Sequence, residues 1–339
     1  MENPMFMESS FSQTLWFSSA FLDHLHAWDA RLGGLFYTIS VICHYLGGSG
    51  FFLGLISFLY AFYRPKLALE VSVSLLTAGI IVSLAKFYFE SPRPFPYPEA
   101  FDEKSFGLPS GHTYTSVVVW GLLFFRIPSL WLRVPAALII LSTPFSRMYL
   151  KVHFLADVSL GFGMGLVHLI AVLFFLRYLD QKTLKTYFFH TKSYRTYTLL
   201  GIILTLSPIV FDSPFLSEEH HYSLASVLTA SGALAGFWIG FLFYPRFSKA
   251  HFLDWGLPFV EGKFSIQGLL LRISTLLIII LCFYVLPGQF VKNSIWKEDL
   301  FLRYLRYLLI GFALVFLYPL SLQTIFNGKY LLKSENETT

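Results

Sequence analysis

The sequence has 339 residues, of which 55% are hydrophobic, 19% aromatic and only 13% charged. That length could hold two soluble domains, but this composition excludes an ordinary soluble globular protein. The formal net charge of +5 does not indicate a nucleic-acid partner, because Lys and Arg fall in short segments between apolar runs, where they orient membrane helices. The sequence therefore predicts an all-α, polytopic bundle of transmembrane helices.

The first 34 residues are predicted to form an extracytoplasmic or interfacial segment. They mix aromatic side chains such as Trp16 and Trp28 with charged ones such as Asp23 and Arg31. They lack the basic start and the uninterrupted apolar core of a cleaved signal peptide. We therefore expect an amphipathic helix at the membrane surface over residues 1–32.

Apolar runs that can span ~30 Å of hydrocarbon predict about nine membrane crossings after this segment. The first run is interrupted by His44 and by Gly47-Gly48-Ser49-Gly50, and we interpret it as one long or broken crossing. The expected crossings lie at 35–63, 67–89, 113–125, 131–149, 154–176, 196–211, 223–244, 268–287 and 304–323.

The crossings predict three further divisions of the chain and an orientation. A membrane core occupies 35–178, additional C-terminal transmembrane helices occupy 179–325, and 326–339 form a cytoplasmic tail. More than half of the 25 Lys and Arg residues fall on the side of the membrane that holds this tail. Because basic loops stay in the cytoplasm, the N-terminus and the loop at 90–110 are expected outside it.

Polar residues that a membrane protein rarely tolerates occur in three groups between residues 86 and 157. They are Lys86, six residues, then Arg93-Pro94; Pro109-Ser110-Gly111-His112; and Ser146-Arg147, five residues, His153, three residues, then Asp157. Three cations, two histidines, a hydroxyl and a carboxylate suit phosphoryl transfer, in which most of the catalysis is positioning and charge neutralisation.

His153 and Asp157 are four residues apart, and on a helix that spacing places them on one face. Asp157 can accept the proton on one ring nitrogen, which leaves the other nitrogen as a nucleophile toward phosphorus. A polar pair that only binds two helices together is the alternative. The presence of Arg147 and His112 nearby in the sequence favours the catalytic interpretation.

Ser110, Gly111 and His112 stand at the predicted first turn of a helix. Free backbone N–H groups there, with a glycine that allows close approach, form an anion site. Ser110 can donate a hydroxyl hydrogen bond and also cap the helix, and His112 can protonate a leaving oxygen. The alternative is a helix cap beside an interfacial histidine.

Lys86 and Arg93 come from the end of the second crossing and the loop after it. An arginine fork suits two phosphate oxygens, and a lysine supplies a compact charge, although a lysine at a helix end often only reaches the headgroups. Arg147 lies on the side where basic residues are disfavoured. It therefore needs an anionic partner, for which we expect the substrate phosphate.

The order and spacing K-x6-RP, PSGH and SR-x5-H-x3-D closely resemble the type 2 phosphatidic acid phosphatase (PAP2) superfamily. That superfamily includes lipid phosphate phosphatases, glucose-6-phosphatases and vanadium haloperoxidases. The resemblance covers residues 86–157, and every fixed position is present. It implies a PAP2-like catalytic core at 35–178 and a phosphatase without metal or cofactor that works through a phosphohistidine on His153.

The function expected from these observations is hydrolysis of a lipid phosphomonoester or pyrophosphate at the extracytoplasmic face, in a bacterial inner membrane with the site toward the periplasm. Alternatives are a phosphatase of a soluble sugar phosphate, a lipid phosphotransferase and a non-catalytic lipid-binding membrane protein. The sequence does not indicate an oligomeric state.

Other polar residues carry weaker expectations. Glu218, Glu219, His220 and His221 form a cluster that is expected in a solvated outer loop, with headgroup recognition as an alternative. His168 lies within an apolar run and is expected to bond a neighbouring helix rather than the substrate.

Overall fold

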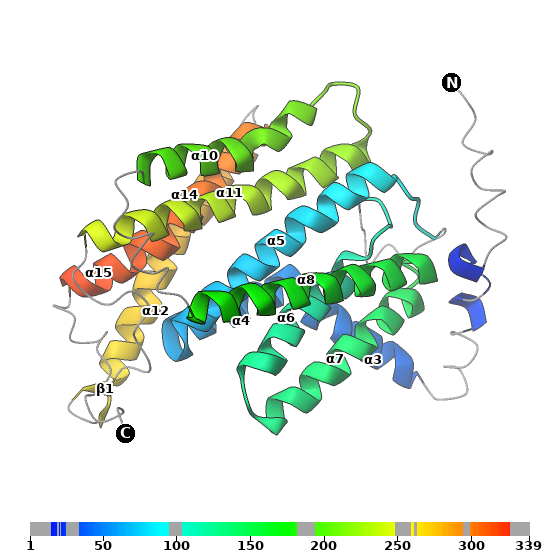
Figure 1. Ribbon diagram of the computed structural model, residues 1–339, viewed down its shortest axis with the longest axis horizontal. Helices are drawn as coiled ribbons and strands as arrows, with labels where there is room; N and C mark the ends of the chain where they lie inside the picture. Colours follow the sequence, from blue (N-terminus) through cyan, green and yellow to red (C-terminus); the bar gives the residue numbers. More distant parts are fainter. Residues whose placement is uncertain are drawn as a thin grey trace. The chain divides into compact units, whose positions relative to one another are not determined.

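The computed structural model describes residues 15–18, 20, 22–24, 34–94, 104–181, 194–247, 259–260, 263–293 and 299–325. These residues are almost entirely helical, apart from one antiparallel pair of two-residue strands (Figure 1). The predicted all-α fold is therefore confirmed. The interfacial helix predicted at 1–32 and the tail predicted at 326–339 lie largely or wholly outside the described residues.

The elements are η1 (Leu15–Phe17), α3 (Leu35–Leu46), α4 (Ser49–Phe58), η2 (Leu59–Tyr63), α5 (Pro65–Phe89), α6 (Gly111–Arg126), α7 (Leu130–Tyr149), α8 (Leu155–Gln181), α10 (Tyr194–Leu206), η4 (Ser207–Phe211), α11 (Glu218–Phe247), β1 (Phe259–Val260), β2 (Lys263–Phe264), α12 (Ile266–Ile280), η5 (Leu281–Val285), α13 (Leu286–Lys292), α14 (Leu300–Phe312), η6 (Ala313–Leu317) and α15 (Tyr318–Ile325).

Each of the nine predicted crossings coincides with a helical stretch among the described residues. Five stretches are long and apolar enough to cross a membrane, and a sixth is obtained if α3 and the helix from Gly50 to Tyr63 count as one broken span. The chain is therefore a multi-pass membrane protein. The number nine stays a prediction, because the stretches at 113–125, 131–149 and 196–211 are not among these spans. Helix α6, for example, has only 16 residues, a length of about 24 Å at the helical rise.

Two compact units make up the chain. The first contains residues 1–53, 78–175 and 213–224, and the second contains residues 54–77, 176–212 and 225–339. Every predicted site residue lies in the first unit. The division into a core at 35–178 and C-terminal helices at 179–325 stays a prediction.

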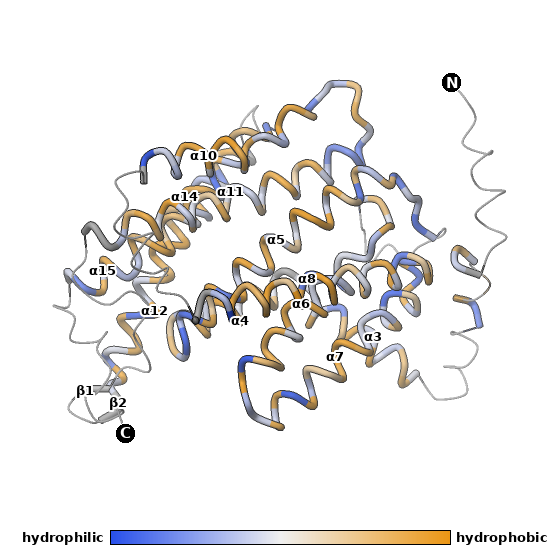
Figure 2. Tube along the Cα trace, viewed as in Figure 1, coloured by the Kyte–Doolittle hydropathy of each residue, from blue (hydrophilic) through white to orange (hydrophobic). Residues whose placement is uncertain are grey.

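In the first unit, α6 is the central helix, and most of its side chains from Thr113 to Leu123 are buried. The hydroxyls of Ser116 on α6 and Thr143 on α7 are 3.1 Å apart, and the Trp120 indole N–H donates to the Leu46 carbonyl at the end of α3. Figure 1 shows α6 and α7 as an antiparallel pair, and Figure 2 shows hydrophilic residues at both ends of their connecting turn. This packing explains how so short a helix keeps a fixed position.

Helix α8 approaches α6 closely through two glycines one turn apart. A Cβ atom on Gly161 would lie 2.7 Å from the Ser110 carbonyl oxygen, and one on Gly165 would lie 3.1 Å from that of Tyr114. Small residues at this spacing allow the backbones of membrane helices to come together. The approach fixes the start of α6 against α8.

The second unit uses the same device between α11 and α14. A Cβ atom on Gly232 would lie 2.5 Å from the Tyr304 carbonyl oxygen, and one on Gly236 would clash with the Leu308 carbonyl oxygen. Side chains bond across helices here as well: the hydroxyls of Thr205 and Tyr304 are 2.8 Å apart. Close backbone contact and isolated hydrogen bonds hold this unit together.

Candidate active site

The first motif is held by a loop segment that follows α5. Lys86 is buried, and its ammonium group donates to the Ser105 hydroxyl at 2.8 Å. It therefore does not extend toward the headgroups. Arg93 donates through Nε to the Ser105 carbonyl at 2.7 Å and through Nη2 to the Phe106 carbonyl at 3.2 Å.

Arg93 also reaches the third motif. Its Nη1 donates to the Val152 carbonyl at 2.8 Å and lies 3.2 Å from His153 Nε2. One guanidinium therefore ties the loop after α5 to the loop before α8. An arginine can make these contacts because its guanidinium carries several N–H donors in one plane, whereas the ammonium group of a lysine does not.

His153 and Asp157 form the predicted pair, with His153 Nδ1 3.2 Å from Asp157 Oδ2. Both side chains are buried, with 1% and 0% exposure. His153 stands two residues before α8, which begins at Leu155. Asp157 Oδ2 accepts from the Phe154 backbone N–H at 2.9 Å, as an acidic residue at the third helical position does in a capping box.

The tautomer of His153 follows from its partners. A guanidinium can only donate, so Nε2 accepts from Arg93 and Nδ1 carries the proton that Asp157 accepts. Burial, and then the charges of Arg93, Arg147 and Lys86, hold the pKa of His153 well below the ordinary value of an imidazole. The ring is therefore neutral, and its Nε2 lone pair faces Arg93.

The second motif begins α6, which starts at Gly111. The backbone N–H of Ser110 donates to the Asp157 carbonyl at 2.9 Å, so the second and third motifs are bonded through the main chain. Ser110 stands at the N-cap position, but its side chain makes no capping hydrogen bond. The capping role expected for it is wrong, because the hydroxyl instead accepts from the Thr113 hydroxyl at 3.1 Å.

His112 and Arg147 meet a residue that sequence reasoning did not assign to the site. Arg147 on α7 has 0% exposure, and its Nη1 lies 2.6 Å from His44 Nδ1 on α3. The His44 ring also stacks on the His112 ring, with centroids 5.2 Å apart and planes inclined by 18°. The only sequence signal was a histidine interrupting an apolar run.

The structure thus brings the predicted residues together in two connected groups. Lys86, Arg93, His153 and Asp157 form one group, with Ser105 as an additional partner of both cations. His112 and Arg147 form the other through His44. The Val152 backbone N–H donates to the Arg147 carbonyl, and the charge of His112 acts on the pKa of His153.

Gly111 begins α6, but a Cβ there would meet only ordinary contact with Val82.

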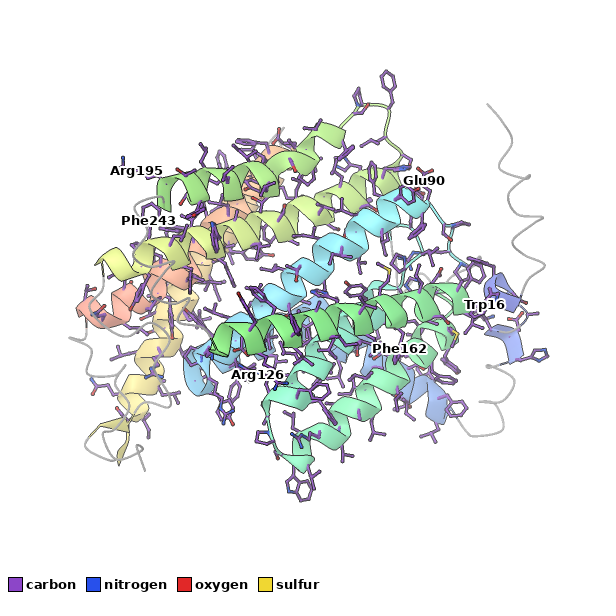
Figure 3. The ribbon with its side chains drawn as sticks, in the orientation of Figure 1. Trp16, Glu90, Arg126, Phe162, Arg195 and Phe243 are labelled. Carbon is purple, nitrogen blue, oxygen red and sulfur yellow. The ribbon has the colours of Figure 1, made fainter. Side chains whose placement is uncertain are left out.

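The cluster at 218–221 is also placed differently from expectation. It forms the first turn of α11 rather than a loop. His220 Nε2 lies 3.0 Å from a carboxylate oxygen of Glu90, the residue that follows α5 and is labelled in Figure 3. The His220 ring also packs edge-on against Phe87 and Phe106, beside the carbonyl that Arg93 binds.

His168 behaves as expected. Its Nδ1 lies 3.1 Å from the Tyr114 hydroxyl, which joins α8 to α6. The prediction that it bonds a neighbouring helix is confirmed.

Comparison with known proteins gives consistent matches. A family model described as the PAP2 superfamily matches residues 67–181. Phosphatidylglycerophosphatase B of Bacillus subtilis (strain 168) is 30% identical over 151 residues, which are 41% of this chain and 72% of that protein. A crystal structure of a transmembrane PAP2 type phosphatidylglycerolphosphate phosphatase from Bacillus subtilis matches 54% of this chain and 90% of its own, with 23% identity and a TM-score of 0.38.

The family match includes all three motifs, and the curated relative is matched over more than two thirds of its length. The predicted resemblance is therefore confirmed: the chain belongs to the PAP2 superfamily and is a multi-pass membrane phosphatase of that family.

Proposed function

We propose that the protein hydrolyses a lipid phosphomonoester or pyrophosphate at the extracytoplasmic membrane face, through a phosphohistidine on His153 and without a metal ion. The observation that carries this proposal is the state of His153. It is buried, neutral and oriented by Asp157, its Nε2 lone pair faces Arg93, and the charges of Arg147 and Lys86 also act on the ring. Such a nitrogen is an activated nucleophile beside a site for an anion.

In the first step, His153 Nε2 attacks the phosphorus atom and the bond to the leaving oxygen breaks. His112 donates a proton to that oxygen. Arg93 Nη1 turns from Nε2 to a phosphate oxygen, which frees the lone pair. Asp157 stabilises the imidazole as it gains positive charge.

In the second step, a water molecule attacks the phosphorus atom of the phosphohistidine. His112 accepts a proton from this water, the P–N bond breaks, and inorganic phosphate leaves. His153 returns to its neutral form. The two steps together consume one water and one phosphoester bond, and both histidines recover their starting protonation.

The three cations supply the charge neutralisation that a metal ion supplies in other phosphatases. The charges of Lys86, Arg93 and Arg147 all act on the nucleophile, and together they suit the oxygens of a tetrahedral anion. We expect activity to persist in EDTA and to be inhibited by vanadate, which adopts a five-coordinate geometry at the transferred atom. Loss of activity on chelation would contradict this part of the proposal.

A lipid substrate is supported by the membrane setting and by the relative named a phosphatidylglycerophosphatase. A headgroup at the interface can reach helix ends without its chains leaving the bilayer. The distribution of Lys and Arg supports an extracytoplasmic site, and a bacterial inner membrane with the site toward the periplasm is part of the same proposal.

The test is phosphate release by the purified protein from phosphatidylglycerophosphate, phosphatidate, prenyl diphosphates, sphingoid-base phosphates, lipid A and a soluble sugar phosphate. We expect release from at least one lipid, and we expect His153→Asn to reduce it by at least about a thousandfold. Phosphate labelled in the substrate should remain on the wild-type protein after an alkaline quench and be absent from the variant. Release from the sugar phosphate alone would overturn the lipid assignment, and an active His153→Asn protein would overturn the mechanism.

A further inference from the structure

We infer that His44 is a positioning residue of this active site. It fixes the orientation of the Arg147 guanidinium and of the His112 ring. This inference rests on the proposed function. His44 belongs to α3, outside the three motifs and outside residues 67–181, which the family model matches. It nevertheless contacts a residue of the second motif and a residue of the third.

The contact with Arg147 fixes the state of the His44 ring. A guanidinium has no acceptor, so at 2.6 Å the Nδ1 atom of His44 must be the acceptor. The His44 ring is therefore neutral and carries its proton on Nε2. A carboxylate in this place would form an ion pair with Arg147, whereas a neutral imidazole orients the guanidinium without adding a negative charge.

The contact with His112 is a stack of rings. The centroid distance of 5.2 Å and the angle of 18° match an offset parallel arrangement of aromatic rings. A neighbouring ring face limits how far His112 can rotate, which keeps its nitrogens directed at one place. A general acid must be so directed, because proton transfer requires hydrogen-bond reach of the leaving oxygen.

The end of α3 is itself held in place. A Cβ atom on Gly47, three residues after His44, would lie 3.3 Å from Cδ2 of His112. The Leu46 carbonyl accepts from the indole N–H of Trp120 on α6. The apolar run is therefore interrupted at Gly47-Gly48 because α3 ends where the chain lies against the side chain of His112.

Two substitutions separate the two contacts. His44→Asn keeps an acceptor near the position of Nδ1 but removes the ring, and His44→Phe keeps a ring but removes the acceptor. We expect His44→Phe to weaken vanadate inhibition about tenfold or more, because a buried charged donor loses its partner. We expect His44→Asn to bind vanadate as the wild type does, with kcat lowered about tenfold because His112 is no longer aligned.

Gly47→Ala gives a third, independent variant. Its methyl group would press on His112 without touching Arg147, so kcat should fall while vanadate inhibition is unchanged. The matched controls are His168→Asn and His168→Phe, which alter a helix-bound histidine bonded to Tyr114 and should leave both quantities near those of the wild type.

The outcomes distinguish this inference from the proposed function. If the wild type releases no phosphate from any substrate, the proposed function fails. If the wild type is active and depends on His153, but the two His44 variants lower kcat and vanadate affinity in equal proportion, or neither, the positioning role is overturned. Should His44→Phe fail to fold, a Gly47→Ala protein with wild-type kcat would equally overturn it.

Discussion

Two buried arginines show how differently the two compact units use the same side chain. Arg147 in the first unit and Arg272 in the second have 0% and 1% exposure. A charged side chain inside a membrane protein is costly wherever it lies. Arg272 Nη1 donates to the Ala61 carbonyl at 3.1 Å, within the π-helical turn η2, where the regular ladder of backbone hydrogen bonds is altered.

Arg147 is bonded instead to a neutral imidazole, and its charge acts with those of Arg93 and Lys86 on the pKa of His153. The charges of all three cations act on His153, whose imidazole is paired with the Asp157 carboxylate. The bond between Arg272 and a backbone carbonyl links α12 to η2. A group of cations near one nucleophile is stabilised best when an anion binds. We therefore expect Arg147 to act in substrate binding and Arg272 to act in joining helices.

The largest effect on activity should come from removing Arg147, and removing Arg272 provides the comparison. Arg147→Met should reduce activity by about 10²–10³-fold, the cost of losing one preorganised contact to transition-state charge. Arg272→Met should change activity per folded molecule by less than about twofold, because a buried polar group replaced by an apolar one acts on stability. Phosphate release and thermal unfolding in detergent would measure the two effects. An Arg147→Met protein that loses only stability would remove the distinction between the arginines.

The glycine contacts allow the same comparison at smaller scale. Gly161→Ala should displace the start of α6, because its Cβ would lie 2.7 Å from the Ser110 carbonyl oxygen, and activity should fall about tenfold through loss of alignment. Gly236→Ala, between α11 and α14, should lower the unfolding temperature and leave the activity of the folded protein unchanged. Gly163→Ala is the control, since a Cβ there meets nothing within 4 Å. Equal loss of activity in the first two variants would contradict this account.

The sequence predicted the fold class and the family because both depend on local signals. Apolar runs of spanning length and three motifs at fixed spacing are visible without any tertiary structure. His44 and Ser105 were not assigned, because their roles depend on contacts over 103 and 12 to 19 residues of chain. The side chain of Ser110 failed as a cap for a different, local reason: its hydroxyl is bonded by the Thr113 hydroxyl three residues later.

The cluster at the start of α11 offers a more modest test of the first unit. His220→Ala should remove the contact with Glu90 and the edge-on contacts with Phe87 and Phe106. Because Arg93 binds the Phe106 carbonyl, we expect KM to rise about two- to fivefold, within the range of a partly exposed pair, while kcat is kept. His221→Ala, on a different side of the same helical turn, should leave KM unchanged. A fall in kcat without a rise in KM would contradict an effect of the cluster on substrate binding through Arg93.

The smallest effect concerns pH. The pKa of His153 is lowered in the folded protein, whereas an unfolded chain has an ordinary histidine pKa of about 6.5. Below that pH the unfolded state binds a proton that the folded state does not, so stability should decrease as the pH falls. His153→Asn removes this contribution. As the pH falls from 7.5 toward 5.5, the unfolding temperature of the wild type in detergent should therefore decrease by more than that of the variant. A wild type that loses no more stability than the variant as the pH falls would contradict a neutral His153, and with it the contrast between an arginine whose charge acts on a nucleophile and one that joins two helices.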